Sequence, residues 1–367
     1  MDHYKNELRE MGGGRASNIE LYRIIVMLLI VAHHYFVNSG LRFILTDVPN
    51  SGLAIFYTLF GAWGKTGINC FVLITGYYMC KRNISLRKFL KLVIAVIFYN
   101  VIIYSVFVVT GYSALSLKEA IVTLLPIKGC NDGFTSAFIL FYLAIPFLNI
   151  LLEALNKKTH GLLLLLLLFI YTIMPLLMAK VTFNYFSWFG VLYLIASYIR
   201  LYGLPHNDSP KFWGWLTLAT VVVSSVSIIS LYFVFHRGIY FFVSDSNSIM
   251  ALVLSISSFM FFKNIKIKYN RGINAIAATT FGVLLIHANS DTMRNFLWYD
   301  LFDNLGHYAK PLYAVAVVLI VFTICACIEY TRIKTIEKPL LNAAEKGCLL
   351  LKERFMVIRT KYADKLR

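Results

Sequence analysis

Long apolar stretches, separated by short polar segments, recur along the whole of this 367-residue chain. About 20 consecutive apolar residues cross the hydrocarbon core of a bilayer, and a helix satisfies its own backbone hydrogen bonds there. Only 14% of the residues are charged, against about 25% in soluble domains. The sequence therefore predicts an all-α, polytopic membrane helix bundle of about ten transmembrane helices. The apolar blocks cover residues 20–38, 60–80, 90–110, 134–155, 160–178, 183–202, 212–235, 239–262, 275–298 and 311–333.

The net charge of +17 is distributed very unevenly between the two sides of such a bundle. If the N-terminus is cytoplasmic and the chain alternates sides through ten spans, 27 Lys and Arg residues lie inside and 7 outside, with Lys65 unassigned. Cytoplasmic segments of membrane proteins are enriched in Lys and Arg. The charge therefore predicts two cytoplasmic termini and contact with membrane lipids, rather than a nucleic-acid partner.

Three segments are expected along the chain: a cytoplasmic N-terminal segment over residues 1–19, a transmembrane domain over 20–333 and a basic tail over 334–367. The tail mixes Leu and Phe with many Lys and Arg. It is either an amphipathic helix on the inner membrane surface or a solvated helix. The six cysteines have neither metal-ligand spacing nor the pattern of a disulfide framework, and no metal is expected.

The first apolar block carries ionisable residues, which are costly at membrane depth and usually functional. Glu20 and Arg23 are three residues apart and can pair on one helix face. His34 follows Arg23 by eleven residues, close to three whole turns, so both point the same way with a rise of about 16 Å between them. His33 is rotated by about 100° and faces elsewhere. The alternative is that either histidine only bonds a neighbouring helix.

The ninth block contains a second polar group, formed by His287, Asp291 and Arg294. Their spacing of i, i+4 and i+7 predicts a shared helix face. His287 lies about 18 Å from the inner side, a height similar to that of His34. The two histidines would line one cavity if their helices are neighbours. The alternative is a structural histidine with an Asp291–Arg294 ion pair near the outer interface.

Four short segments follow one another in a recognisable order. They are Asn18-Ile19-Glu20-Leu21-Tyr22-Arg23 followed by His34, Phe71-Val72-Leu73-Ile74-Thr75-Gly76-Tyr77, Pro146-Phe147-Leu148-Asn149, and Phe281-Gly282-Val283-Leu284-Leu285-Ile286-His287. Together with the ten predicted spans they resemble the acyltransferase-3 family of integral membrane acyltransferases, over nearly the whole chain. Many members of that family O-acetylate cell-surface polysaccharides in bacteria.

The resemblance implies an O-acetyltransferase of the bacterial cell membrane, with the central domain as its transmembrane acyltransferase domain. It implies cytoplasmic acetyl-coenzyme A (acetyl-CoA) as donor and a hydroxyl of a lipid-linked or cell-surface glycan as acceptor. His34 is then the catalytic residue, as general base or transient acyl carrier. Arg23, oriented by Glu20, would hold the phosphates or pantetheine of the donor. His287 would assist in orientation or proton transfer.

A basic cytoplasmic run follows the second block. The family commonly has an Arg-x-x-Arg pair there, and this chain has Lys88-x-x-Lys91 with Arg87 adjacent. Lysine keeps the charge but loses the bidentate fork of arginine. These three residues are expected either to bind the donor phosphates or only to orient the chain in the membrane.

Two other functions fit many spans with polar residues inside them. One is a non-enzymatic transporter or flippase for a glycan or small solute, although the sequence shows no repeat symmetry of the transporter kind. The other is a membrane acyltransferase that acts on a lipid or a small molecule such as an amino acid. Labelled acetyl-CoA distinguishes an acyltransferase from a transporter, because only an enzyme transfers the label to a glycan or to protein.

Overall fold

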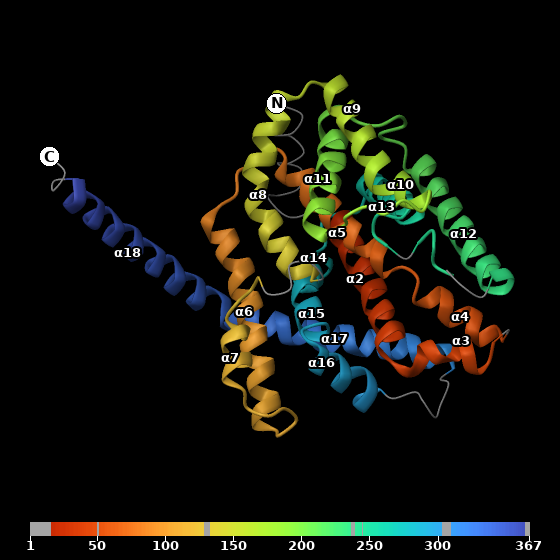
Figure 1. The fold of residues 1–367 in the computed structure, drawn as a ribbon, viewed down its shortest axis with the longest axis horizontal. Coiled ribbons are helices and arrows are strands. Elements are labelled where there is room, and N and C mark those ends of the chain that lie inside the picture. Colours follow the sequence, from red (N-terminus) through yellow and green to blue (C-terminus); the bar gives the residue numbers. More distant parts are fainter. Residues whose placement is uncertain are drawn as a thin grey trace.

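The computed structural model describes residues 16–49, 51–127, 133–235, 239–243, 245–302 and 310–363 (Figure 1). Every regular element in these ranges is helical, so the predicted all-α class is confirmed. The predicted N-terminal segment lies mostly outside the described residues. The α-helices are α2 (Ser17–Asn38), α3 (Ile44–Asp47), α4 (Gly52–Phe60), α5 (Gly64–Met79), α6 (Leu86–Val109), α7 (Leu117–Thr123), α8 (Phe134–Ala154), α9 (Lys157–Leu168), α10 (Met174–Leu176), α11 (Tyr185–Tyr202), α12 (Pro210–Phe235), α13 (Ile249–Asn264), α14 (Arg271–Ala277), α15 (Thr280–His287), α16 (Asp291–Asn295), α17 (Pro311–Thr335) and α18 (Glu337–Ala363). A 3-10 helix covers Gly40–Phe43, and π-helical turns cover Phe169–Ile173 and Phe296–Leu301.

Six of the described helices are long and apolar enough to cross a membrane. They are α2, α6, α8, Lys157–Leu176 (α9 with α10), Pro210–Val234 of α12, and α17. A seventh span results if the bent pair Arg271–His287 and Asp291–Leu301 is counted as one. Of the remaining predicted blocks, the second and sixth overlap α5 and α11, which are shorter or less apolar. The eighth, 239–262, is helical only from Ile249, where α13 begins.

The helices α2, α5 and α11 lie together in the middle of the bundle (Figure 1). Small residues let α5 approach both neighbours. A Cβ added to Gly67 would lie 2.7 Å from Ile30, and one added to Gly76 would lie 2.9 Å from the Cβ of Ala196. Because other helices rather than lipid surround α5, it tolerates buried polar residues such as Asn69, which accepts a hydrogen bond from the Trp188 indole.

The predicted ninth span is not one continuous helix. α15 ends at His287, and the chain turns by 96° before α16 begins. Ser290 starts the new helix, because its hydroxyl accepts a hydrogen bond from the Met293 amide over 3.1 Å. Asn289 donates to the Leu285 carbonyl at the end of the old helix. The prediction that His287, Asp291 and Arg294 share one helix face is therefore wrong.

The predicted basic tail is helical as α18, which projects away from the bundle beyond α17 (Figure 1). Its first turns are attached to the start of α6. Lys91 Nζ lies 2.6 Å from Glu337 Oε1, and Arg87 forms an ion pair with Glu345. The tail therefore docks on the basic run through its own acidic residues.

Candidate active site

Two histidines from distant parts of the chain meet inside the bundle. His34 Nδ1, on α2, lies 2.9 Å from His287 Nε2, on the last turn of α15. His287 is fully buried, and the ring centroids are 5.1 Å apart. The similar heights expected from the sequence are thus matched by direct contact between the two side chains.

The hydrogen bonds of His287 determine which nitrogen of His34 is basic. Nδ1 of His287 lies 2.6 Å from the Val283 carbonyl oxygen, which can only accept. This nitrogen therefore carries the hydrogen, and Nε2 of a neutral His287 is an acceptor. His34 then donates from Nδ1, which leaves the lone pair of its Nε2 available to a reacting group.

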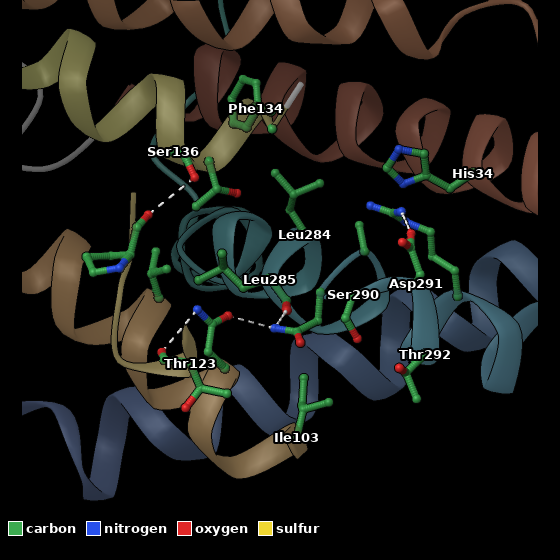
Figure 2. Close-up of a pocket in the computed structure, with 18 of the residues that line it drawn as sticks. His34, Ile103, Thr123, Phe134, Ser136, Leu284, Leu285, Ser290, Asp291 and Thr292 are labelled. Carbon is green, nitrogen blue, oxygen red and sulfur yellow. Dashed lines mark hydrogen bonds and ion pairs between the residues drawn. The ribbon is translucent and has the colours of Figure 1, made fainter. Parts of the chain in front are cut away.

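A cavity of about 690 Å³ adjoins this pair, and His34 lines it whereas His287 does not (Figure 2). The volume is within the range of small-molecule sites. The lining mixes apolar side chains with hydroxyl, amide and charged groups. Labelled in Figure 2 are His34, Ile103, Thr123, Phe134, Ser136, Leu284, Leu285, Ser290, Asp291 and Thr292.

The cavity occupies one end of the bundle. α2, α6 and α15 contribute residues from their later halves, whereas α5 and α8 contribute residues from their first turns. Helices that alternate in direction bring these parts to the same side. All the helix ends around the cavity are those that the charge distribution predicts to be outside the cell.

The family model of the acyltransferase-3 family, which describes an acyltransferase domain, matches residues 17–330. The chain belongs to the acyltransferase-3 family. Among curated proteins and among solved structures, no match to the chain was found. The match contains both histidines and all the helices around the cavity, and it makes the protein a membrane acyltransferase.

Two asparagines hold the wall of the acyltransferase cavity together. Asn289, just after the end of α15, donates to Asn100 Oδ1 of α6 over 3.0 Å. Asn100 donates in turn to the Thr123 carbonyl at the end of α7 over 3.4 Å. These asparagines were not predicted, although an amide inside a long apolar block is itself a signal of a polar contact.

His33 contributes to the same cavity, contrary to the prediction that it faces elsewhere. Its Nδ1 lies 2.6 Å from the Gly61 carbonyl oxygen, so it does bond to a different part of the chain from His34. The predicted pair of Asp291 and Arg294 is present, and both side chains line the cavity next to His34.

Glu20 and Arg23 lie at the opposite end of α2 from the cavity. Glu20 is buried, and its Oε1 lies 3.8 Å from Arg23 Nε, so the predicted pairing is confirmed. Arg23 is not a lining residue of the cavity. Met27, which is 1% exposed, fills the helix face between Arg23 and His34.

The candidate donor-binding residues Arg87, Lys88 and Lys91 do not line the cavity either and lie at the start of α6. Arg87 and Lys91 are engaged by the carboxylates of α18, and Lys88 is exposed. The structure therefore brings these three residues to the tail helix and not to the histidines.

A buried charge network at the end of α17 was also not predicted. Arg332 binds Glu329 through two hydrogen bonds, of 2.6 and 2.8 Å, and both residues are 3% exposed. Glu329 accepts a further bond from Tyr99. A Cβ on Gly282 would lie 2.3 Å from the Glu329 Cδ, which explains the glycine in the segment Phe281–His287. The signal was present in the sequence, as an acid and a base three residues apart within an apolar block.

Proposed function

We propose that this acyltransferase is an O-acetyltransferase of the bacterial cytoplasmic membrane, which moves an acetyl group from cytoplasmic acetyl-CoA to a hydroxyl of a lipid-linked or cell-surface polysaccharide. The observation that carries the proposal is the position of His34. Its Nε2 is left basic by His287, at the wall of a cavity lined with groups that hydrogen-bond sugar hydroxyls. Family membership supports the reaction class.

In the proposed reaction, His34 Nε2 takes the proton of the acceptor hydroxyl while that oxygen attacks the thioester carbonyl carbon. The new C–O bond forms, the C–S bond breaks, and the imidazolium returns the proton to the thiolate of coenzyme A. His287 stabilises the imidazolium because its Nε2 accepts from His34 Nδ1. The variant in which His34 carries the acyl group transiently uses the same nitrogen.

We also propose ten spans, two cytoplasmic termini and the boundaries 1–19, 20–333 and 334–367. The one-sided charge distribution supports this orientation, as does the position of every helix end around the cavity. The cavity would then open towards the outside of the cell. The basic residues of α18 would contact anionic lipids at the inner surface.

On the donor side, Arg23, oriented by Glu20, would bind the phosphates or pantetheine of acetyl-CoA near the cytoplasmic surface. The rise of about 16 Å along α2 to His34 is a distance that an extended pantetheine arm must cover. Arg87, Lys88 and Lys91 would add positive charge for the phosphates. Because α18 already occupies Arg87 and Lys91, the donor would compete with its carboxylates.

The test is acetyl transfer from labelled acetyl-CoA by membranes that carry His34→Ala. A general base raises the reaction rate about 10²- to 10⁴-fold, so we expect the rate of acetyl transfer to fall at least about 100-fold in a variant expressed at the normal level. His206→Ala, at an exposed histidine outside the cavity, is the matched control and is expected to keep full activity. Full activity of His34→Ala would overturn the role of His34, and absence of transfer by the wild type to any glycan would overturn the proposed function.

A further inference from the structure

Lys65 brings a positive charge to the wall of the cavity near the base. It lies in the first turn of α5 and lines the cavity together with His33, His34 and Tyr185. Its ammonium nitrogen donates a hydrogen bond to the Tyr185 hydroxyl over 2.9 Å. An ammonium group has three hydrogens, so Tyr185 leaves two of them for another acceptor.

The charges do not cancel at the histidine end of the cavity. Arg294 is paired there with Asp291. Lys65 and Glu119 also line the cavity, but neither forms an ion pair with a side chain that the structure describes. Lys65 directly follows Gly64, where an added Cβ would lie 2.3 Å from the Cβ of His33, so α5 holds Lys65 beside the two adjacent histidines of α2. Glu119 lies on α7 and is exposed. One positive charge therefore stays uncompensated beside His34, within the described part of the chain.

The place of Lys65 in its helix is unfavourable for the unliganded protein. Backbone dipoles make the N-terminus of a helix positive, so a cation in the first turn is repelled. α5 is 16 residues long, and no side chain caps its start. A cation at membrane depth usually faces a functional cavity or has an opposite charge beside it. Lys65 faces the cavity, but no side chain among the described residues places an opposite charge beside it.

We infer that Lys65 binds an anionic group of the acceptor, either a phosphate or a carboxylate, and thereby holds the reacting hydroxyl at Nε2 of His34. Both groups accept strong charge-assisted hydrogen bonds from an ammonium. An anion there gains from the charge of Lys65 and from the positive end of α5 together. The inference rests on the proposed acetyl transfer and narrows the acceptor to an acidic glycan.

The first test is mass spectrometry of the surface glycans of the host with and without this gene. We expect acetyl groups to disappear from a polymer whose acetylated sugar or its direct neighbour carries a phosphate or a carboxylate. Loss of acetyl groups from a neutral polymer would overturn the anionic acceptor alone. No loss from any glycan would overturn the proposed function and this inference with it.

The second test measures acetyl transfer to that polymer by membranes with matched amounts of each variant. Lys65→Met is expected to raise the KM for the polymer about 10- to 100-fold with kcat within about threefold, because one charge-assisted bond is lost. Lys65→Arg keeps the charge and is expected to stay near the wild type, which excludes a folding defect at this position. Lys180→Met, which removes an exposed lysine outside the cavity, is expected to have no effect.

Chemical neutralisation of the polymer completes the comparison. Carbodiimide and borohydride reduce carboxylates, and hydrofluoric acid removes phosphates, so the treatment that raises the wild-type KM identifies the anion. On the neutralised polymer, the wild type and Lys65→Met are expected to have equal KM. An unchanged KM in Lys65→Met would overturn the inference. An equal fall of kcat on both forms of the polymer would also overturn it, because Lys65 would then stabilise the negative charge that develops during transfer.

Discussion

Removal of the His287 imidazole tests whether this residue works by fixing the tautomer of His34. In His287→Ala, the Nδ1 hydrogen of His34 loses its acceptor, and the ring is no longer held with Nε2 unprotonated. The bond that His287 Nδ1 donates to the Val283 carbonyl also disappears, but it involves no reacting group. The change therefore acts on His34 without removing any side chain that lines the cavity.

The size of the effect follows from the bond that is lost. A hydrogen bond to a charged group contributes about 1.5–3 kcal/mol, and His34 is charged only after it has taken the proton. At about 1.4 kcal/mol per factor of ten, we expect kcat to fall about 10- to 150-fold. The KM for either substrate is expected to change little, because His287 does not line the cavity.

The assay is acetyl transfer at saturating substrates by purified protein in lipid nanodiscs. His287→Gln is the companion variant, because its amide oxygen keeps an acceptor for His34 and fills most of the buried space. It is expected to recover part of the lost kcat. A folded His287→Ala protein with wild-type kcat would refute the tautomer argument, and so would a loss expressed only in KM.

Three further changes address the parts of the protein that support the site. Gly282→Ala places a Cβ 2.3 Å from Glu329, so thermal unfolding in detergent should show a free energy of unfolding lower by about 1–3 kcal/mol. Gly190→Ala, where an added Cβ meets nothing within 4 Å, should leave the free energy of unfolding unchanged. Arg332→Met leaves the Glu329 carboxylate buried without its ion-pair partner, and the same assay should show a free energy of unfolding lower by about 3–5 kcal/mol. Wild-type stability of this variant would contradict a stabilising role of the Arg332–Glu329 network. Glu345→Gln releases the arginine at the start of α6, and the KM for acetyl-CoA should fall up to about fivefold, since such exposed pairs contribute at most about 1 kcal/mol; an unchanged or higher KM would contradict competition by α18.

Six of the ten predicted blocks correspond to helices that are long and apolar enough to cross a membrane, because those blocks are long enough to be recognised alone. The heights of His34 and His287 could also be predicted, because the rise per residue is fixed. Their contact could not, since it depends on the packing of α2 against α15. Such packing depends on the shapes of side chains, as does the close approach of α15 to α17 at Gly282, and a periodic pattern reveals neither.

The errors and omissions concern polar residues within apolar blocks. The break after His287 has a local signal, since Asn289 and Ser290 are residues that end and start helices, but apolar periodicity on both sides obscured it. Lys65 could not be assigned to a side from charge alone. Its role beside His34 appears only when α5 is placed against α2.

The close contact between α2 and α5 has a consequence for the energy supply of the cell. An enzyme that takes its donor from one side and its acceptor from the other must pass an acyl group without also conducting protons. Met27 and Ile30 are 1% and 4% exposed, and Gly67 lets α5 press directly on Ile30. On the proposed orientation, this apolar layer lies between Arg23 and His34 and would block the passage of protons, and the pantetheine arm of the donor would have to displace it to reach His34.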